Sequence, residues 1–175
     1  IPLRSVLLPL IPLLAYVGDQ SVPGTEPGAL HVALPDGRDV GVGVAICYEV
    51  IYPRTLYEAS DAGAQVMVIQ SSNAMYQGSN QIEQQFAISR VRAAEMRRDI
   101  LVVTTSGISG RIDAHGGVVF EATQPGAASG VETMTLGEQR TPVMAGGWLA
   151  EDLVAIATLV WLAGGLAVRN AARMG

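Results

Sequence analysis

Three short apolar runs, each followed by polar residues, dominate the hydrophobic pattern in the middle of the chain. They cover residues 40–46, 65–70 and 100–104. The first run, which alternates Val and Gly, is typical of a strand with close backbone neighbours, and the other two are typical of strands buried on both faces of a sheet. Helical patterns at 53–60 and 80–98 separate the runs. This alternation of strand and helix predicts βαβ units and therefore an α/β fold.

The longer helical pattern has one apolar and one basic side. Ile82, Phe86 and Ala93 fall on one side, which Ile88 and Val91 widen. The basic side consists of four arginines, which we predict to be solvated or ion-paired: Arg90, Arg92, Arg97 and Arg98.

Short strands and turns are predicted on either side of this unit. The turn residues Pro35, Asp36 and Gly37 join a strand at 30–34 to the first apolar run. Residues 99–135 indicate mostly short strands and turns, with a hairpin over 111–120.

Both ends of the chain are strongly apolar. Residues 1–14 contain three prolines, which exclude one long helix and leave either a buried edge of the fold or an apolar loop on a membrane surface. Residues 153–168 carry no charge, and with Trp148 to Ala150 they approach the length of about 20 residues that a spanning helix needs. A buried core helix is the alternative. We therefore divide the chain into a catalytic part, 1–145, and a transmembrane helix with a short tail, 146–175.

The charge pattern bears on orientation and on partners. Arg169 and Arg173 follow the terminal apolar run, so the positive-inside rule predicts a cytoplasmic C-terminus and a domain on the extracytoplasmic side. Charged residues make up only 15%, against roughly 25% in an average soluble domain, which favours membrane contact. A net charge of −5 argues against nucleic acid. One cysteine and two distant histidines predict neither a disulfide nor a metal site, and we expect no cofactor.

The single cysteine, Cys47, is the candidate nucleophile because it follows the first apolar strand directly. At a sharp strand end its sulfur would be exposed, and the amide of Tyr48 would be an oxyanion donor. Glu49 is either a capping carboxylate or an orienter of the site. The competing interpretations are a buried structural thiol, or a Cys–His dyad with His31 or His115.

These residues resemble the nitrilase, or carbon–nitrogen hydrolase, superfamily, and in particular its membrane-embedded bacterial branch, the apolipoprotein N-acyltransferases. The matching segments are 45–50 around Cys47, 72–76, 86–95 on the long helix, 104–109 and the terminal apolar helix. The resemblance implies an αββα sandwich, present here in part, and a Glu-Lys-Cys triad. It also implies acyl transfer from a phospholipid, through a cysteine thioester, to the N-terminal diacylglyceryl-cysteine of a lipoprotein.

Residue by residue, the resemblance assigns the nucleophile to Cys47 and site support to Tyr48 and Glu49. Asn73, Met75 and Tyr76 match a substrate loop near the site. Met75 departs from the family pattern, which commonly has a bulky aromatic residue in that loop, and Gln85 stands where some relatives have histidine.

The chain contains no lysine, because all eleven basic residues are arginines. The family's lysine therefore cannot come from these 175 residues, and we expect them to be the C-terminal part of a longer protein, inactive alone. Two alternatives remain open: a soluble nitrilase-like amidase that hydrolyses a small amide, and a catalytically inactive, membrane-tethered interaction module.

Overall fold

The fold is built around one mixed, six-stranded sheet. The computed structural model describes residue 9 and residues 24–122, 126 and 129–174. The strands follow sequence order across the sheet, and the three central ones are parallel while every other pair is antiparallel. The strands are β1 (Ala29–Ala33), β2 (Asp39–Ile46), β3 (Val66–Ser71), β4 (Ile100–Thr104), β5 (Ser109–Ile112) and β6 (Val118–Ala122). The predicted α/β class is confirmed, whereas the segment 1–14 lies outside the described residues apart from Pro9.

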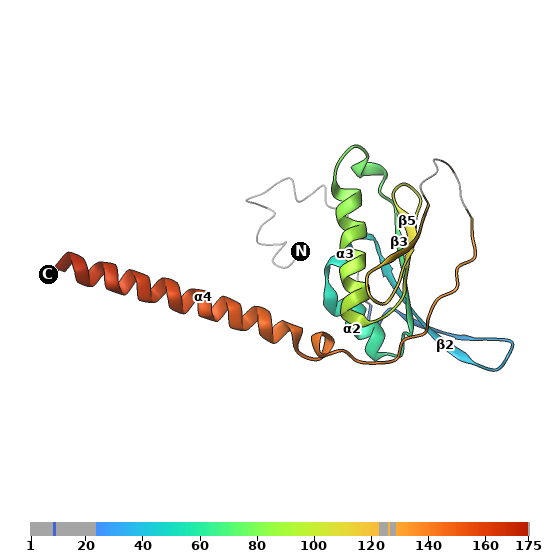
Figure 1. Cartoon of the computed structure of the whole chain (residues 1–175), viewed down its shortest axis with the longest axis horizontal. Helices are drawn as coiled ribbons and strands as arrows, with labels where there is room; N and C mark the ends of the chain where they lie inside the picture. Colours follow the sequence, from blue (N-terminus) through green and yellow to red (C-terminus); the bar gives the residue numbers. More distant parts are fainter. Residues whose placement is uncertain (1–8, 10–23, 123–125, 127–128, 175) are drawn as a thin grey trace.

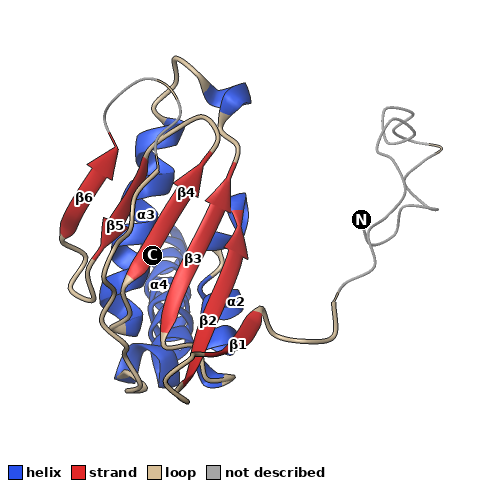
Figure 2. Cartoon of the chain, turned by 90° about the vertical axis from the view of Figure 1, so that its right-hand side faces the viewer, coloured by secondary structure: helices blue, strands red, loops and turns tan. Residues whose placement is uncertain are grey.

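Two helices connect the parallel strands and cover one face of the sheet (Figure 2). Helix α2 (Pro53–Asp61) joins β2 to β3 and has proline in its first turn, where the missing N–H costs nothing. Helix α3 (Gln81–Met96) joins β3 to β4 and ends at Arg97, which has the left-handed conformation of a common helix C-terminus. Two short 3₁₀ turns, η2 (Cys47–Ile51) and η3 (Ala74–Tyr76), follow the ends of β2 and β3.

The hydrophobic core lies between these helices and the sheet. Its largest fully buried apolar side chains come from both layers and are Leu56, Met67, Ile69, Met96, Ile100, Ile112 and Val50. The expectation that the strands are buried on both faces is only partly right, because Gln70 is exposed and Val103 is 47% exposed. Burial alternates along these strands, so the core-facing side is the one packed under α2 and α3.

The sides of α3 differ from the prediction at two positions. Val91 is 54% exposed and does not widen the apolar face. Arg98, predicted to be solvated or ion-paired, is only 2% exposed, and its guanidinium donates to the backbone carbonyls of Ala64, Met96 and Gln139. The backbone that precedes α4 brings the carbonyl of Gln139 to Arg98. That contact depends on the tertiary structure, so the sequence pattern could not show it.

The terminal apolar run forms a helix, α4 (Pro142–Met174), which projects away from the sheet (Figure 1). Its base is anchored to the domain through Met144, which belongs to the hydrophobic core. Among the described residues, no helix meets the combined length and hydropathy that a membrane span requires, so the predicted transmembrane helix is not supported. The helix begins at Pro142, so the predicted division between residues 145 and 146 falls inside it.

Candidate active site

Cys47 lies where β2 ends and the short turn η2 begins. Its backbone φ is +52°, in the left-handed region that non-glycine residues rarely adopt. The thiol is free and half-buried. Strand β2 runs parallel to β3 and β4, so Cys47 stands at the carboxyl edge of the parallel strands, where α/β proteins commonly bind ligands. The predicted strand-end placement is therefore confirmed, and the sharp turn is present in the backbone.

Glu49 is a local cap of the Cys47 turn. Its Oε2 accepts a hydrogen bond of 2.7 Å from the backbone N–H of Ile46, the residue before the cysteine. A carboxylate that accepts from a backbone N–H at a helix start makes a charge-assisted bond. Of the two interpretations, the structure shows the capping carboxylate, which holds the backbone on both sides of Cys47.

Tyr48 occupies the turn directly after Cys47, and its side chain is 51% exposed. In the first turn of a helix the backbone N–H groups have no acceptor within the helix. The amide of Tyr48 follows Cys47 directly in this first turn, and its role as an oxyanion donor stays a prediction.

Beside the turn, the loop after β3 is held by a buried polar cluster. Asn73 is 2% exposed, and its amide donates to Oε1 of Gln85 at 2.7 Å. The Ser71 hydroxyl donates to Oδ1 of Asn73 at 2.6 Å. The backbone N–H of Asn73 donates to the carbonyl of Ser106, which ties this loop to the one after β4. Asn73 thus holds the loop in place through these hydrogen bonds. Its buried side chain is already bonded to Ser71 and Gln85 and is not free to contact a substrate.

The tip of the same loop behaves differently. The Met75 side chain is 91% exposed, and Tyr76 is partly exposed. Both belong to η3, which sits at the same sheet edge as Cys47. The predicted substrate loop therefore divides into a buried anchor, Asn73, and an exposed tip that is free to meet a ligand.

Arg92 has a structural role that the sequence pattern did not indicate. It is ion-paired, as one of the alternatives predicted, through Nη1 to Glu95 on the same helix. Its other nitrogens donate to the carbonyls of Val50 and Ile51 at the end of η2, at 3.0 Å and 2.7 Å. The spacing of Arg92 and Glu95 on the helix could have suggested the ion pair. Only the tertiary structure reveals the carbonyl partners.

Neither histidine is placed to activate the thiol. His31 is paired across the strands with Gly41, six residues before Cys47, which is about 20 Å along a strand. His115 lies in the turn between β5 and β6 and contacts Arg97. The competing interpretation of a Cys–His dyad does not fit the structure, because both histidines lie toward the opposite edge of the sheet.

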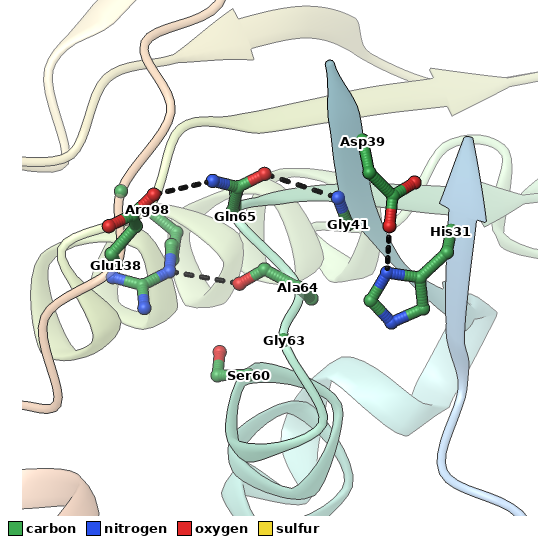
Figure 3. A pocket seen from close by; sticks show the side chains of 10 residues that line it. His31, Asp39, Gly41, Ser60, Gly63, Ala64, Gln65, Arg98 and Glu138 are labelled. Atoms are coloured by element: carbon green, nitrogen blue, oxygen red, sulfur yellow. Dashed lines mark hydrogen bonds and ion pairs between the residues drawn. The ribbon is translucent and has the colours of Figure 1, made fainter. Parts of the chain in front are cut away.

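A pocket of about 310 Å³ also lies at that opposite edge (Figure 3). Nδ1 of His31 donates to the carboxylate of Asp39 at 3.2 Å on one side of it, and Gln65 donates to Glu138 at 2.8 Å on the other. Its lining combines polar side chains with glycine and alanine residues and includes the buried Arg98. This pocket is remote from Cys47 and has no part in the site at the carboxyl edge.

Cys47 brings a free thiol to the carboxyl edge of the parallel strands. Within the described part of the chain, no cluster of three His, Cys, Asp or Glu side chains could hold a metal ion. The site therefore offers a thiol at a sharp turn, a neighbouring backbone donor and an exposed loop tip. An activated thiol in such a setting can attack a carbonyl carbon and form a thioester.

Comparison with known proteins connects this geometry to a family. The family model for carbon–nitrogen hydrolases matches residues 13–159. An apolipoprotein N-acyltransferase from Mycolicibacterium smegmatis is 38% identical over 95 residues, covering 54% of this chain and 15% of the relative. One from Haemophilus influenzae is 27% identical over 129 residues, covering 71% of this chain and 23% of the relative. The chain thus spans less than a quarter of the length of these relatives.

Solved structures are similar at lower identity. An amidase from Nesterenkonia is 20% identical, with a TM-score of 0.47, over 60% of this chain and 41% of the amidase. A Saccharomyces cerevisiae member of branch 10 of the nitrilase superfamily is 22% identical, with a TM-score of 0.45, over 58% of this chain and 38% of that protein. Because the family model matches most of the sequence, the chain belongs to the carbon–nitrogen hydrolase family.

Proposed function

We propose that these residues are part of an N-acyltransferase in which Cys47 is the nucleophile. The observation that carries the proposal is the strand-end turn with Cys47 at φ +52°, at the carboxyl edge of the parallel strands. The family match and the names of the similar relatives support acyl transfer as the reaction type.

The proposed reaction has two steps. First, the thiolate of Cys47 attacks the ester carbonyl carbon of a phospholipid, a C–S bond forms, and the ester C–O bond breaks to release a lysophospholipid that takes up a proton. Second, the α-amino group of a diacylglyceryl-cysteine lipoprotein attacks the thioester carbonyl carbon, a C–N bond forms, the C–S bond breaks, and the proton lost by the amine regenerates the thiol. The Tyr48 amide would stabilise the oxyanion in both steps.

The remaining catalytic groups would come from outside these 175 residues. A Glu-Lys-Cys triad needs a lysine, and this chain has none. We propose that the base and the cation are supplied by other parts of the gene product. The purified 175 residues should therefore form no acyl-enzyme, and turnover comparable with that of the whole gene product would contradict the proposal.

A membrane substrate is supported by the surface of α4. Large apolar side chains on this helix are 49–76% exposed: Leu153, Val154, Ile156, Leu159, Val160, Trp161 and Leu162. Burial of such side chains against lipid is favourable. We therefore propose that α4 contacts the cell membrane. The orientation that the sequence analysis expected, with Cys47 on the extracytoplasmic side, stays a prediction.

The test is a search for the acyl-thioester. The gene product that contains this chain is incubated with phospholipid and analysed by mass spectrometry, and the mass increase of one acyl group should map to the peptide that contains Cys47. Cys47→Ala should abolish the adduct. An adduct that persists in this variant would refute the assignment of Cys47, and release of ammonia from a small amide without any lipid adduct would favour the amidase.

A further inference from the structure

The turn that carries Cys47 is capped at both of its ends. At its start, Glu49 accepts from the backbone N–H of Ile46. At its end, a short 3₁₀ turn leaves carbonyl groups without partners inside the helix. Arg92 fills that role by donating to the carbonyls of Val50 and Ile51 at 3.0 Å and 2.7 Å. One rigid guanidinium thus fixes the two carbonyls that close the turn.

Arg92 is itself held in place by side chains from two elements. Glu95 binds its Nη1, and the hydroxyl of Tyr57 on α2 donates to Oε2 of Glu95 at 3.0 Å. The Arg92 side chain is 13% exposed and that of Glu95 is 24% exposed, so water competes little for these bonds. Glu95 and Tyr57 therefore fix the orientation of the guanidinium. We call these two side chains the support of Arg92, and through them the position of the turn depends on the position of α3.

The same support is joined to the base of α4. The hydroxyl of Thr141, the residue before α4, donates to the backbone carbonyl of Glu95. The backbone N–H of Met144 in the first turn of α4 donates to that hydroxyl at 3.3 Å. The start of α4 and the end of the cysteine turn are thus connected through Glu95 and Arg92.

We infer that Arg92 is a positioning residue for the Cys47 nucleophile, an inference that rests on the proposed function of Cys47. Arg92 bonds the carbonyls of Val50 and Ile51, and it acts by fixing the turn whose first residue is Cys47. Because Cys47 sits only three residues before Val50, release of the two carbonyls would let the whole turn shift. A misplacement of about 1 Å at a reacting group costs on the order of 10²-fold in rate.

The experiment compares three variants in the gene product that contains this chain. Arg92→Met removes the guanidinium. Arg92→Lys keeps the positive charge, but it lacks the planar set of N–H donors that bonds both carbonyls at once. Arg90→Met is the matched control, because Arg90 lies on the same helix and donates to the carbonyl of Gly116, away from the turn. Two rates are measured below the unfolding midpoint: thioester formation with phospholipid, and alkylation of the thiol by iodoacetamide.

The two rates should move in opposite directions. Arg92→Met should slow thioester formation by about 10- to 100-fold, and the KM for phospholipid should stay unchanged. It should also speed alkylation of Cys47, because the half-buried thiol is released from its fixed turn. Both rates of Arg92→Lys should lie between those of Arg92→Met and those of the parent protein. Arg90→Met should match the parent protein in both assays.

Equal behaviour of Arg92→Met and Arg90→Met in both assays would overturn the inference. If Arg92→Met does not fold, Arg92→Lys and Tyr57→Phe, which removes the hydrogen bond onto Glu95, take its place and are judged by the same two rates. If the parent protein forms no thioester, the proposed function fails, while the alkylation rates still decide whether Arg92 fixes the turn.

Discussion

The backbone strain at Cys47 predicts that glycine at this position gives a more stable protein than alanine. Elsewhere in a folded chain, alanine is normally the more stabilising of the two residues. A non-glycine residue in the left-handed region costs about 1–2 kcal/mol, and Cys47 has φ +52°. Glycine avoids that cost but loses more chain entropy on folding, which costs about 0.5–1 kcal/mol relative to alanine. The difference between the midpoints of these two costs favours Cys47→Gly over Cys47→Ala by about 0.75 kcal/mol, within a range of about 0–1.5 kcal/mol.

The comparison between the two variants isolates the backbone, because both lack the sulfur. Urea unfolding followed by circular dichroism measures the free energy of unfolding of each. A difference of 1 kcal/mol shifts the melting temperature of a domain of this size by roughly 2–4 °C, so calorimetry can resolve it. The matched pair at Gln84, an exposed position inside α3, should show the normal order, with glycine less stable than alanine by about 1 kcal/mol.

The result that would refute this reasoning is a Cys47→Gly protein less stable than Cys47→Ala. In that case the turn would not hold Cys47 in a strained conformation. A sharp strand end that is maintained against its own strain is a feature of functional sites, so the same measurement bears on the role of the cysteine. The strain would be offset by the caps that Glu49 and Arg92 place on the turn.

Two further predictions concern the packing around this unit. Burial, and next the negative charge of Glu95, raise the pKa of Tyr57 to about 12. The protonated Tyr57 hydroxyl therefore contributes fully to the free energy of unfolding below about pH 10, and this contribution is lost between about pH 10 and 12. Tyr57→Phe should therefore flatten the alkaline fall of the urea midpoint over that range, and an unchanged slope would contradict this origin. A Cβ at Gly41 would lie 1.9 Å from the carbonyl oxygen of Gly63, so Gly41→Ala should lower the free energy of unfolding by about 1–3 kcal/mol or more. The control Gly24→Ala meets no atom within 4 Å and should be neutral in the same urea titration.

The local elements were predictable because they depend on patterns within a few residues. The apolar runs at 40–46, 65–70 and 100–104 became β2, β3 and β4, and Cys47 stands at the end of the first of them as predicted. The helix over 153–168 was also expected, since its residues are uniformly apolar, but the pattern did not show that it would begin at Pro142 and extend from the domain.

Contacts between distant segments could not be predicted, because nothing in the local sequence marks them. Asn73 matches a substrate loop by resemblance, yet Gln85 and Ser106 bury it as a support. Arg98 lies among charged neighbours in sequence, yet a segment more than 35 residues later supplies one of the carbonyls that bury it.

The sequence by itself determined the alternation of strands and helices, the place of Cys47 at a strand end and the family to which the chain belongs. Only the tertiary structure decided how the cysteine turn is held. Secondary structure follows the periodicity of apolar residues, whereas the caps on the turn depend on partners at very different distances along the chain. Glu49 is three residues from Ile46, and Arg92 is 41 and 42 residues from the two carbonyls it holds. The second contact exists only once α3 has packed beside the end of β2.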